Sequence, residues 1–149
     1  MLELDCHCAT FRQATRAITQ LYDNYLRPCD LKITQFTILR MLCRHPDLAR
    51  IADLTGALLI DDTTLTRSLL LMKQNGWVES FVGDVDRRER RLRITRRGRA
   101  LVARAEPLWE AAQAAVNRYL GRNDAKVVHK SASRLASALS EEGYSLSKD

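Results

Sequence analysis

The stretch DDTTLTRSLLLMKQNGWVESFVGDVDRRERRLRIT, residues 61–95, changes its hydrophobic period halfway along. In the first half Leu65, Leu69 and Met72 recur at three- and four-residue steps, which is typical of a helix with one buried face. The Asn-Gly pair that follows favours a left-handed helix end. Beyond it, apolar and polar residues alternate as they do in strands. The stretch therefore predicts a helix followed by a β-hairpin.

The predicted hairpin carries a concentrated positive charge. We expect its first strand over WVESFV, residues 77–82, and its returning strand over RLRIT, residues 91–95, with a turn-rich loop between them. Between residues 81 and 99 the chain has eight arginines against three acidic residues, and the whole chain has a net charge of +6. Such local cationic excess on a folded element indicates a polyanionic partner, foremost nucleic acid.

A second short helix is predicted immediately before residue 61. In LARIADLTGALLI, residues 48–60, the apolar side chains of Ile51, Leu54 and Leu58 share one helical face. Asp61 is a suitable N-cap for the helix that follows. Two short helices joined by a three- or four-residue turn are the outline of a helix-turn-helix. The sequence therefore predicts a helix-turn-helix over about residues 48–75 and a β-hairpin wing over about residues 77–95.

Longer amphipathic helices are expected on both sides of this unit. The first spans about residues 8–26 and ends before Pro28, because the residue before a proline is pushed out of helical space. A second begins after Thr34, a good N-cap. After the hairpin, Thr95 is the expected N-cap of a long helix, and a final helix completes the region 96–142. The predicted fold class is mainly α with a small β-hairpin wing.

Composition narrows the class of protein. With 149 residues, of which 46% are hydrophobic and 28% charged, the chain fits one globular domain spanning residues 1–149. No apolar run approaches the ~20 residues that a membrane span needs. The amino-terminal residues lack the pattern of an export signal. Four cysteines without such a signal indicate a reducing compartment, so we expect a cytoplasmic protein.

Two other classes of function fit the sequence less well. The chain has no Gly-rich phosphate loop and none of the common hydrolase motifs, so an enzyme is the weaker alternative. A module that binds an anionic membrane would need a basic amphipathic helix, whereas the charge here lies on a hairpin. We therefore expect no enzymatic activity, no membrane partner and no cofactor.

The predicted second helix of the helix-turn-helix presents polar groups that suit DNA. Hydroxyls can bond phosphate oxygens or base edges, and an arginine fork matches the O6 and N7 acceptors of guanine. The helix amino terminus adds backbone N–H donors for a phosphate. The candidate DNA contacts from this helix are Thr63, Thr64, Thr66, Arg67 and Gln74.

The segments DDTTLTRSLLLMKQNGWV (61–78) and DVDRRERRLRITRRGRALV (84–102) resemble the multiple-antibiotic-resistance regulator (MarR) family of bacterial transcription factors. The resemblance implies a homodimeric winged helix-turn-helix protein. Its dimerisation helices would be the first, over about residues 8–26, and the last two, over about residues 96–142. The second helix of the helix-turn-helix would enter the major groove and a wing arginine the minor groove.

The resemblance also implies roles for residues of the wing. Arg87 and Arg90 match the position that reaches into the minor groove. Asp86 matches an acid that orients an arginine, and Arg88 is its expected partner. A carboxylate at Asp62, where the family often has a basic or small residue, departs from the pattern and favours stabilisation of the helix through its dipole.

The function expected from this resemblance is a sequence-specific transcriptional regulator, more often a repressor, that binds a pseudo-palindromic double-stranded DNA operator. Family members are commonly released from DNA by a small, often aromatic, anionic ligand. The residues expected to line a site for such an effector are Phe11, Arg12, Thr15, Arg16 and Phe36.

A thiol- or metal-sensing regulator is the alternative. Cys6, His7 and Cys8 could bind a soft metal or act as a thiol switch. The C-x-C spacing matches zinc sites poorly, since these use C-x₂₋₄-C. Because Cys8 lies on the apolar stripe of its predicted helix, a packed structural thiol is the competing interpretation. A disulfide from this segment would more readily reach Cys29, Cys43 or a partner subunit than join Cys6 to Cys8.

Overall fold

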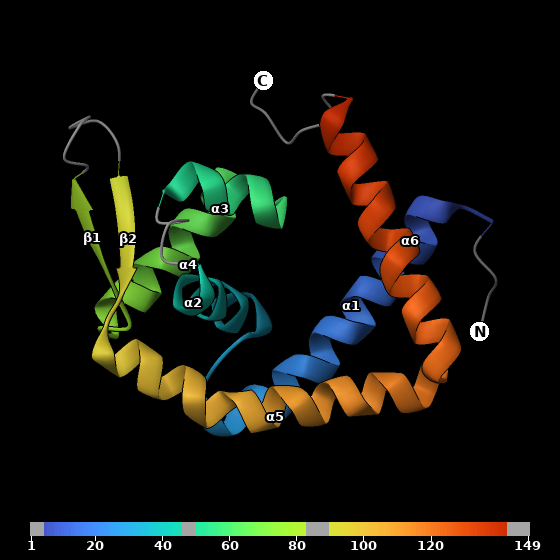
Figure 1. Cartoon of the computed structure of the whole chain (residues 1–149), viewed down its shortest axis with the longest axis horizontal. Helices are drawn as coiled ribbons and strands as arrows, with labels where there is room; N and C mark the ends of the chain where they lie inside the picture. Colours follow the sequence, from blue (N-terminus) through green and yellow to red (C-terminus); the bar gives the residue numbers. More distant parts are fainter. Residues whose placement is uncertain (1–4, 46–49, 83–89, 143–149) are drawn as a thin grey trace.

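The structure, a computed structural model, describes residues 5–45, 50–82 and 90–142. Within these ranges the chain forms helices and one two-stranded antiparallel sheet (Figure 1). The elements are α1 (His7–Leu26), a 3₁₀ turn (Arg27–Cys29), α2 (Ile33–Arg44), α3 (Ile51–Leu58), α4 (Asp62–Gln74), β1 (Val78–Val82), β2 (Arg90–Ile94), α5 (Arg96–Leu120) and α6 (Arg122–Glu141). The predicted fold class, mainly α with a hairpin wing, is confirmed.

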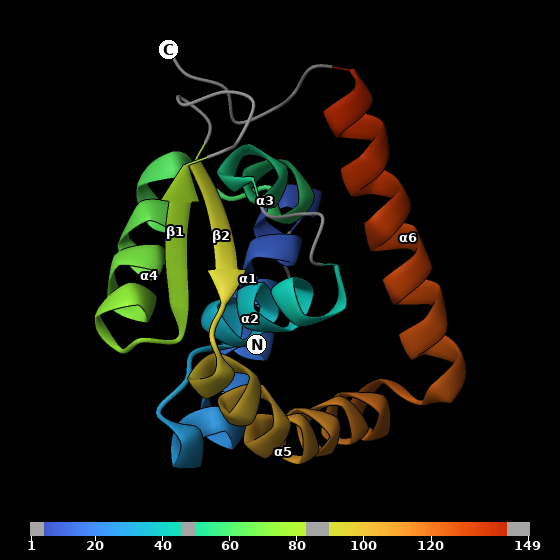
Figure 2. The same cartoon turned by 60° about the vertical axis from the view of Figure 1, so that its left-hand side comes forward.

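The elements divide between two ends of the molecule. Helices α2, α3 and α4 gather with the hairpin at one end, and α5 runs from this lobe toward the other end, where α6 turns away from it (Figures 1 and 2). Helix α5 continues through Pro107 and ends before Gly121, whose φ of 79° marks the break that leads into α6. The long helices thus separate the helix-turn-helix from α6.

The hydrophobic core lies in the lobe around α2. Phe36, Ile38 and Leu39 of α2 are fully buried. They belong to one cluster with buried side chains of the helix-turn-helix, the hairpin and α5. The helix-turn-helix contributes to this cluster Leu54, Leu65, Leu69 and Met72, so the predicted inward face of α4 is confirmed. Because α2 and the hairpin pack on the same side chains of α4, this helix has one fixed orientation.

The start of α2 differs from the sequence prediction. Thr34 was the expected N-cap, but Lys32 occupies that position and the helix begins at Ile33. The Ile33 amide donates to Asp23 Oδ1 of α1 at 2.8 Å. The Lys32 amide donates to the Oε1 atom of Gln35 at 3.0 Å. These acceptors satisfy amides that a helix start leaves unpaired, so the cap comes from Asp23 of α1 and from Gln35 of α2 itself, and not from Thr34.

Helix α5 is joined to α1 and α2 by polar side chains. The Tyr22 hydroxyl of α1 donates to Gln113 Oε1 of α5. Glu106 accepts from Arg40 Nε at 3.1 Å and pairs with Arg44 at 3.6 Å. The Arg40 guanidinium also lies 4.0 Å from the centre of the Trp109 ring, a cation–π contact. The lobe that contains α2 is therefore attached to α5 by oriented contacts as well as by apolar packing.

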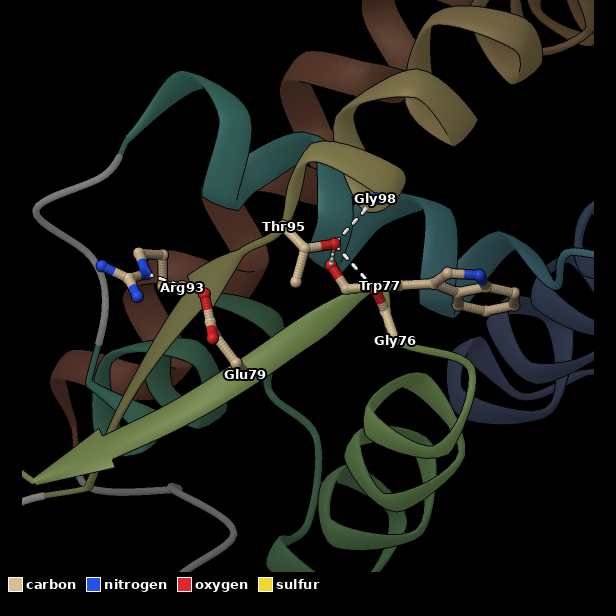
Figure 3. A network of polar contacts seen from close by, with 6 residues as sticks. All are labelled: Gly76, Trp77, Glu79, Arg93, Thr95 and Gly98. Atoms are coloured by element: carbon tan, nitrogen blue, oxygen red, sulfur yellow. Dashed lines mark hydrogen bonds and ion pairs between the residues drawn. The ribbon is translucent and has the colours of Figure 1, made fainter.

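The wing is attached to α5 through Thr95 (Figure 3). The Thr95 hydroxyl accepts from the Gly98 amide at 3.0 Å and caps α5, as the sequence predicts. The same hydroxyl donates to the Gly76 carbonyl at 2.7 Å, and the Thr95 amide donates to the Trp77 carbonyl at 3.0 Å. One residue thus fixes the end of β2, the start of β1 and the start of α5.

Gly98 is required for this close approach. A Cβ atom at residue 98 would lie 2.2 Å from the Trp77 carbonyl oxygen and 2.8 Å from Ile94 Cγ1. The first of these atoms is backbone and cannot rotate away. We therefore expect the Gly98→Ala variant to be destabilised by about 3 kcal/mol, the upper part of the range for inserting a methyl group into a packed site.

Chemical denaturation of Gly98→Ala and of Gly56→Ala tests this expectation. Gly56 lies in α3, and a Cβ atom added there would have no other atom within 4 Å. Alanine at this position should therefore raise the stability by about 0.5–1 kcal/mol through its higher helix propensity. Equal effects of the two variants would contradict the role assigned to the junction.

Candidate nucleic-acid interface

The outward face of α4 is polar at both ends and lies beside the hairpin. Helix α4 and strand β1 are neighbours, as Figure 2 shows. The inward stripe of Leu65, Leu69 and Met72 leaves the opposite face in solvent, and all five α4 residues predicted to contact DNA are exposed. Arg67 has no ion-pair partner among the residues that the structure describes. Its guanidinium is therefore available to an external acceptor.

The turn of the helix-turn-helix and the α4 cap set the angle of that face. Leu59 adopts the left-handed conformation, with φ of 48°, and reverses the chain after α3. Asp61 then caps α4 by accepting from the Thr64 amide at 2.8 Å and from the Thr64 hydroxyl at 2.6 Å. These hydrogen bonds, the one from the hydroxyl first, hold the pKa of the Asp61 carboxyl below its usual value.

The cap changes the role available to Thr64. Its hydroxyl hydrogen is directed at Asp61, so the side chain has no donor left for a phosphate. The hydroxyls of Thr63 and Thr66 have no such bond among the described residues and remain available for one. Of the three predicted threonine contacts, the structure therefore favours these two.

The hairpin alternates buried and exposed side chains as its strand pairing requires. Val78 pairs with Ile94 and Ser80 with Leu92, and these pairs face the core. Glu79 pairs with Arg93 and Phe81 with Arg91 on the opposite face. The wing therefore rests on the core by one face and presents charge from the other.

A backbone bridge holds the wing against the helix-turn-helix. Arg50, just before α3, forms an isolated antiparallel bridge with Arg91 of β2. The returning strand is thereby tied to the start of the helix-turn-helix, and the wing and α4 belong to one surface.

The arginines of β2 are not equivalent. Arg93 Nε lies 3.0 Å from Glu79 Oε1 across the strands (Figure 3). The Arg93 guanidinium also lies over the Phe81 ring. The Arg93 side chain is therefore held by partners within the wing, although both members of the ion pair stay exposed. Arg90, at the end of the strand nearest the hairpin tip, is exposed and has no partner among the described residues. The spacing of the arginines along the chain does not indicate this difference.

Three predicted wing residues lie outside the described residues. Asp86, Arg87 and Arg88 fall in the stretch 83–89, so the expected pair between Asp86 and Arg88 and the minor-groove role of Arg87 stay predictions.

The amino-terminal half of α1 lines two surface hollows. One, of about 600 Å³, is formed by Phe11, Arg12, Thr15 and Arg16 of α1 together with apolar residues of α6, and His7 lies at its edge. Four of the five residues predicted to bind an effector are therefore brought together. Phe36 is not among them, because it is buried in the core against Trp109. The spacing of Phe36 with the other apolar residues of α2 indicates a core position and gives no information about a ligand site.

The adjoining hollow, of about 590 Å³, contains the exposed Cys6 and Cys8 beside Arg12 and Arg16. A bond from these thiols to Cys29 is excluded by geometry, because Cys29 is buried beyond the opposite end of α1, a 20-residue helix about 30 Å long. Burial raises the pKa of the Cys43 thiol, and Arg99 only partly opposes this effect. In the described part of the chain, no three His, Cys, Asp or Glu side chains are grouped to hold a metal ion.

In the single chain, the apolar side chains of α6 are exposed to solvent or only partly covered. The helix has no buried residue, although it carries exposed apolar side chains at helical spacing. Over the described ranges, no helix has both the length and the apolar character needed to cross a membrane.

The chain is similar to known transcriptional regulators. A model of the MarR family matches residues 30–89. The M. tuberculosis transcriptional regulator MosR, in a crystal structure of its complex with DNA, is 35% identical over 92% of this chain and 98% of MosR, with a TM-score of 0.80. A second crystal structure of M. tuberculosis MosR gives 33% identity over 92% of this chain and 97% of MosR, with the same TM-score.

A structure of Bordetella bronchiseptica BpsR, described as regulated in DNA binding by 6-hydroxynicotinic acid, is 20% identical. It covers 89% of this chain and 94% of BpsR with a TM-score of 0.79, which shows a common fold. A search of the curated proteins found no match.

These similarities agree with the geometry of the two DNA-facing elements. The family match spans the helix-turn-helix and reaches the wing, and the likeness to MosR extends over nearly the whole of both chains. The predictions of a winged helix-turn-helix and of a non-enzymatic function are confirmed. The chain belongs to the MarR family of DNA-binding transcriptional regulators.

Proposed function

We propose that this protein is a homodimeric repressor that binds a pseudo-palindromic operator and is released by a small anionic effector. The observation that carries the DNA-binding part is the exposed outward face of α4 beside the wing, with Arg67 and Arg90 unpaired among the described residues. Helix α4 enters the major groove, and the wing lies along the flanking backbone and minor groove. As a DNA-binding regulator it acts in the cytoplasm.

The two unpaired arginines have different roles in this arrangement. Arg67 lies in the middle of α4, where a guanidinium can form a bidentate pair with guanine. Arg90 lies at the distal end of β2, where a contact to phosphate or to the minor groove is expected. Arg67 therefore contributes base preference, and Arg90 contributes affinity that depends little on sequence.

The dimer is supported by the apolar faces that one chain leaves uncovered. Helices do not keep such faces in water without a partner surface, and α6 has no buried residue of its own. The exposed apolar side chains of α1 and α6 are Phe11, Ile18, Val127, Val128, Leu135 and Leu139. A twofold pairing through these helices covers them and places two α4 helices on half-sites about one turn of DNA apart, ~10 bp.

Selection from a random-sequence duplex library with the purified protein tests the DNA-binding proposal. We expect enrichment of an inverted repeat. Arg67→Ala should lower affinity for the selected duplex by about 1–3 kcal/mol and relax base preference at one position in each half-site. Arg90→Ala should weaken binding to all sequences alike and reduce the salt slope by about one unit for each half-site.

Arg118→Ala is the charge-matched control, because Arg118 lies in the last turn of α5, away from the lobe. It should leave base preference and salt slope unchanged. Failure to enrich any sequence, or equal effects of all three arginine variants, would contradict the proposed interface.

The dimer is tested by a double substitution in α6. Leu135→Asp combined with Leu139→Asp should convert the protein from dimer to monomer in analytical ultracentrifugation and weaken operator binding about 100-fold or more, because the two half-sites are then bound independently. Ser137→Asp adds a carboxylate at an exposed position on the opposite side of α6 and should remain dimeric. A double variant that still sediments as a dimer would place the interface elsewhere.

The hollow between α1 and α6 supports the proposed effector. It combines the Phe11 ring and leucines of α6 with the guanidinium groups of Arg12 and Arg16, and its volume is within the range of small-molecule sites. An aromatic acid matches this lining, since its ring needs apolar contact and its carboxylate a paired cation. Because α1 and α6 form both this hollow and the proposed dimer surface, and share Phe11, Leu135 and Leu139 between them, an occupant changes how the two copies pack.

The thiol-sensing alternative rests on the position of Cys6 and Cys8. Both are exposed and share their hollow with Arg12 and Arg16, so a peroxide that enters it meets two thiols and two cations. Peroxide would oxidise the first thiol to a sulfenic acid and be reduced to water. A second thiol would then attack the sulfenic sulfur and form a disulfide with loss of another water.

Operator release by two probes separates the effector from the thiol switch. We expect benzoate to release the wild type and a Cys6→Ser/Cys8→Ser double variant from the operator equally, and to act only weakly on Arg16→Ala. We expect hydrogen peroxide to leave all three proteins bound to the operator. If peroxide releases the wild type but not the double-serine variant, the thiol switch replaces the aromatic effector as the trigger.

A further inference from the structure

Leu70 interrupts the polar outward face of α4. Its side chain is 58% exposed, and the helical repeat places it between Thr63 and Arg67 on one side and Gln74 on the other. A single exposed leucine on a protein surface needs no explanation. This one lies at the centre of the face that the proposed function places in the major groove.

Within the described ranges, neither the core nor the proposed dimer surface explains Leu70. The core contacts of α4 come from Leu65, Leu69 and Met72 on the opposite side of the helix. The apolar faces that the proposed dimer covers belong to α1 and α6, at the other end of the molecule (Figure 1). Neither core packing nor dimerisation therefore removes the Leu70 side chain from water.

The chemistry of the major groove gives such a side chain one favourable contact. Base edges there present hydrogen-bond donors and acceptors, which a leucine cannot pair, and one apolar group, the C5 methyl of thymine. Leu70 follows Arg67 by three residues, and such neighbours have Cβ atoms about 5–6 Å apart. The two side chains lie on the same face of α4 and therefore face neighbouring base pairs of a bound duplex.

We propose that Leu70 is a specificity-determining residue that packs against the methyl group of a thymine, within one or two base pairs of the base read by Arg67. The proposal rests on the proposed function, because it requires α4 to lie in the major groove. It adds to that function the recognition of a base by apolar contact and assigns a partner to the one large apolar side chain at the centre of the outward face.

Replacement of thymine by deoxyuridine tests the contact directly, because it removes the methyl group and keeps the base pair. The probe is the duplex enriched from the random library, with each thymine replaced in turn. For the wild type we expect one thymine in each half-site whose replacement weakens binding about fourfold, the factor for one buried methylene-sized group. Replacement in both half-sites should weaken binding about fifteen-fold.

The Leu70→Ala variant should bind the thymine and deoxyuridine forms of that position equally, while it keeps the wild-type response at every other position. Alanine is a good helix former at an exposed site, so the fold should persist, as a melting curve will verify. Leu71→Ala is the matched control: Leu71 is the next residue of the same helix, 46% exposed and outside the central line of the outward face. It should keep the discrimination of the wild type.

Identical deoxyuridine profiles for wild type and Leu70→Ala would overturn the assignment, as would loss of the discrimination in Leu71→Ala alone. Selection of a new consensus with Leu70→Ala gives an independent readout, in which the same thymine should no longer be enriched. If the wild type enriches no sequence, the proposed function itself fails. Enrichment without coupling to Leu70 overturns only this inference.

Discussion

The orientation of the wing depends on one close contact between Gly98 and the Trp77 carbonyl. The Thr95 hydroxyl lies beside it, caps α5 and donates to the carbonyl of Gly76, two residues beyond the end of α4. Because the end of α4, both strands and the start of α5 meet within this network, none of them can rotate without breaking a hydrogen bond that is partly buried. The angle between α4 and the wing is fixed here.

Helix α5 connects this network to the end of the molecule where α6 lies (Figure 1). Glu106 and Trp109 of α5 bind the Arg40 side chain of α2 from two directions, as an ion pair and through a cation–π contact. Both contacts have a preferred geometry, so they fix the position of α2 on α5 more specifically than apolar packing alone. In the proposed function, this attachment links packing near α1 and α6 to the position of the helix-turn-helix.

Some arginines of the chain form ion pairs that stabilise its packing, and others are available to an external anion. Arg40, Arg44 and Arg93 have carboxylate partners that lie within the same chain. Arg67 and Arg90 have none among the described residues, and both lie on the surface formed by α4 and the wing. The arginine-rich sequence thus combines paired cations that stabilise packing with unpaired cations that favour a polyanion.

The sequence by itself determined the elements whose causes are local. Apolar spacing predicted α4 and its buried face, and Asp61 and Thr95 predicted the caps of α4 and α5, because each signal acts within one or two helical turns. The tertiary structure alone decided what depends on distant residues. Asp23 of α1 accepts from the first amide of α2, Glu79 pairs with Arg93 from another strand, and core packing places Phe36 outside the hollow between α1 and α6. A pattern along one segment cannot encode a partner supplied by another.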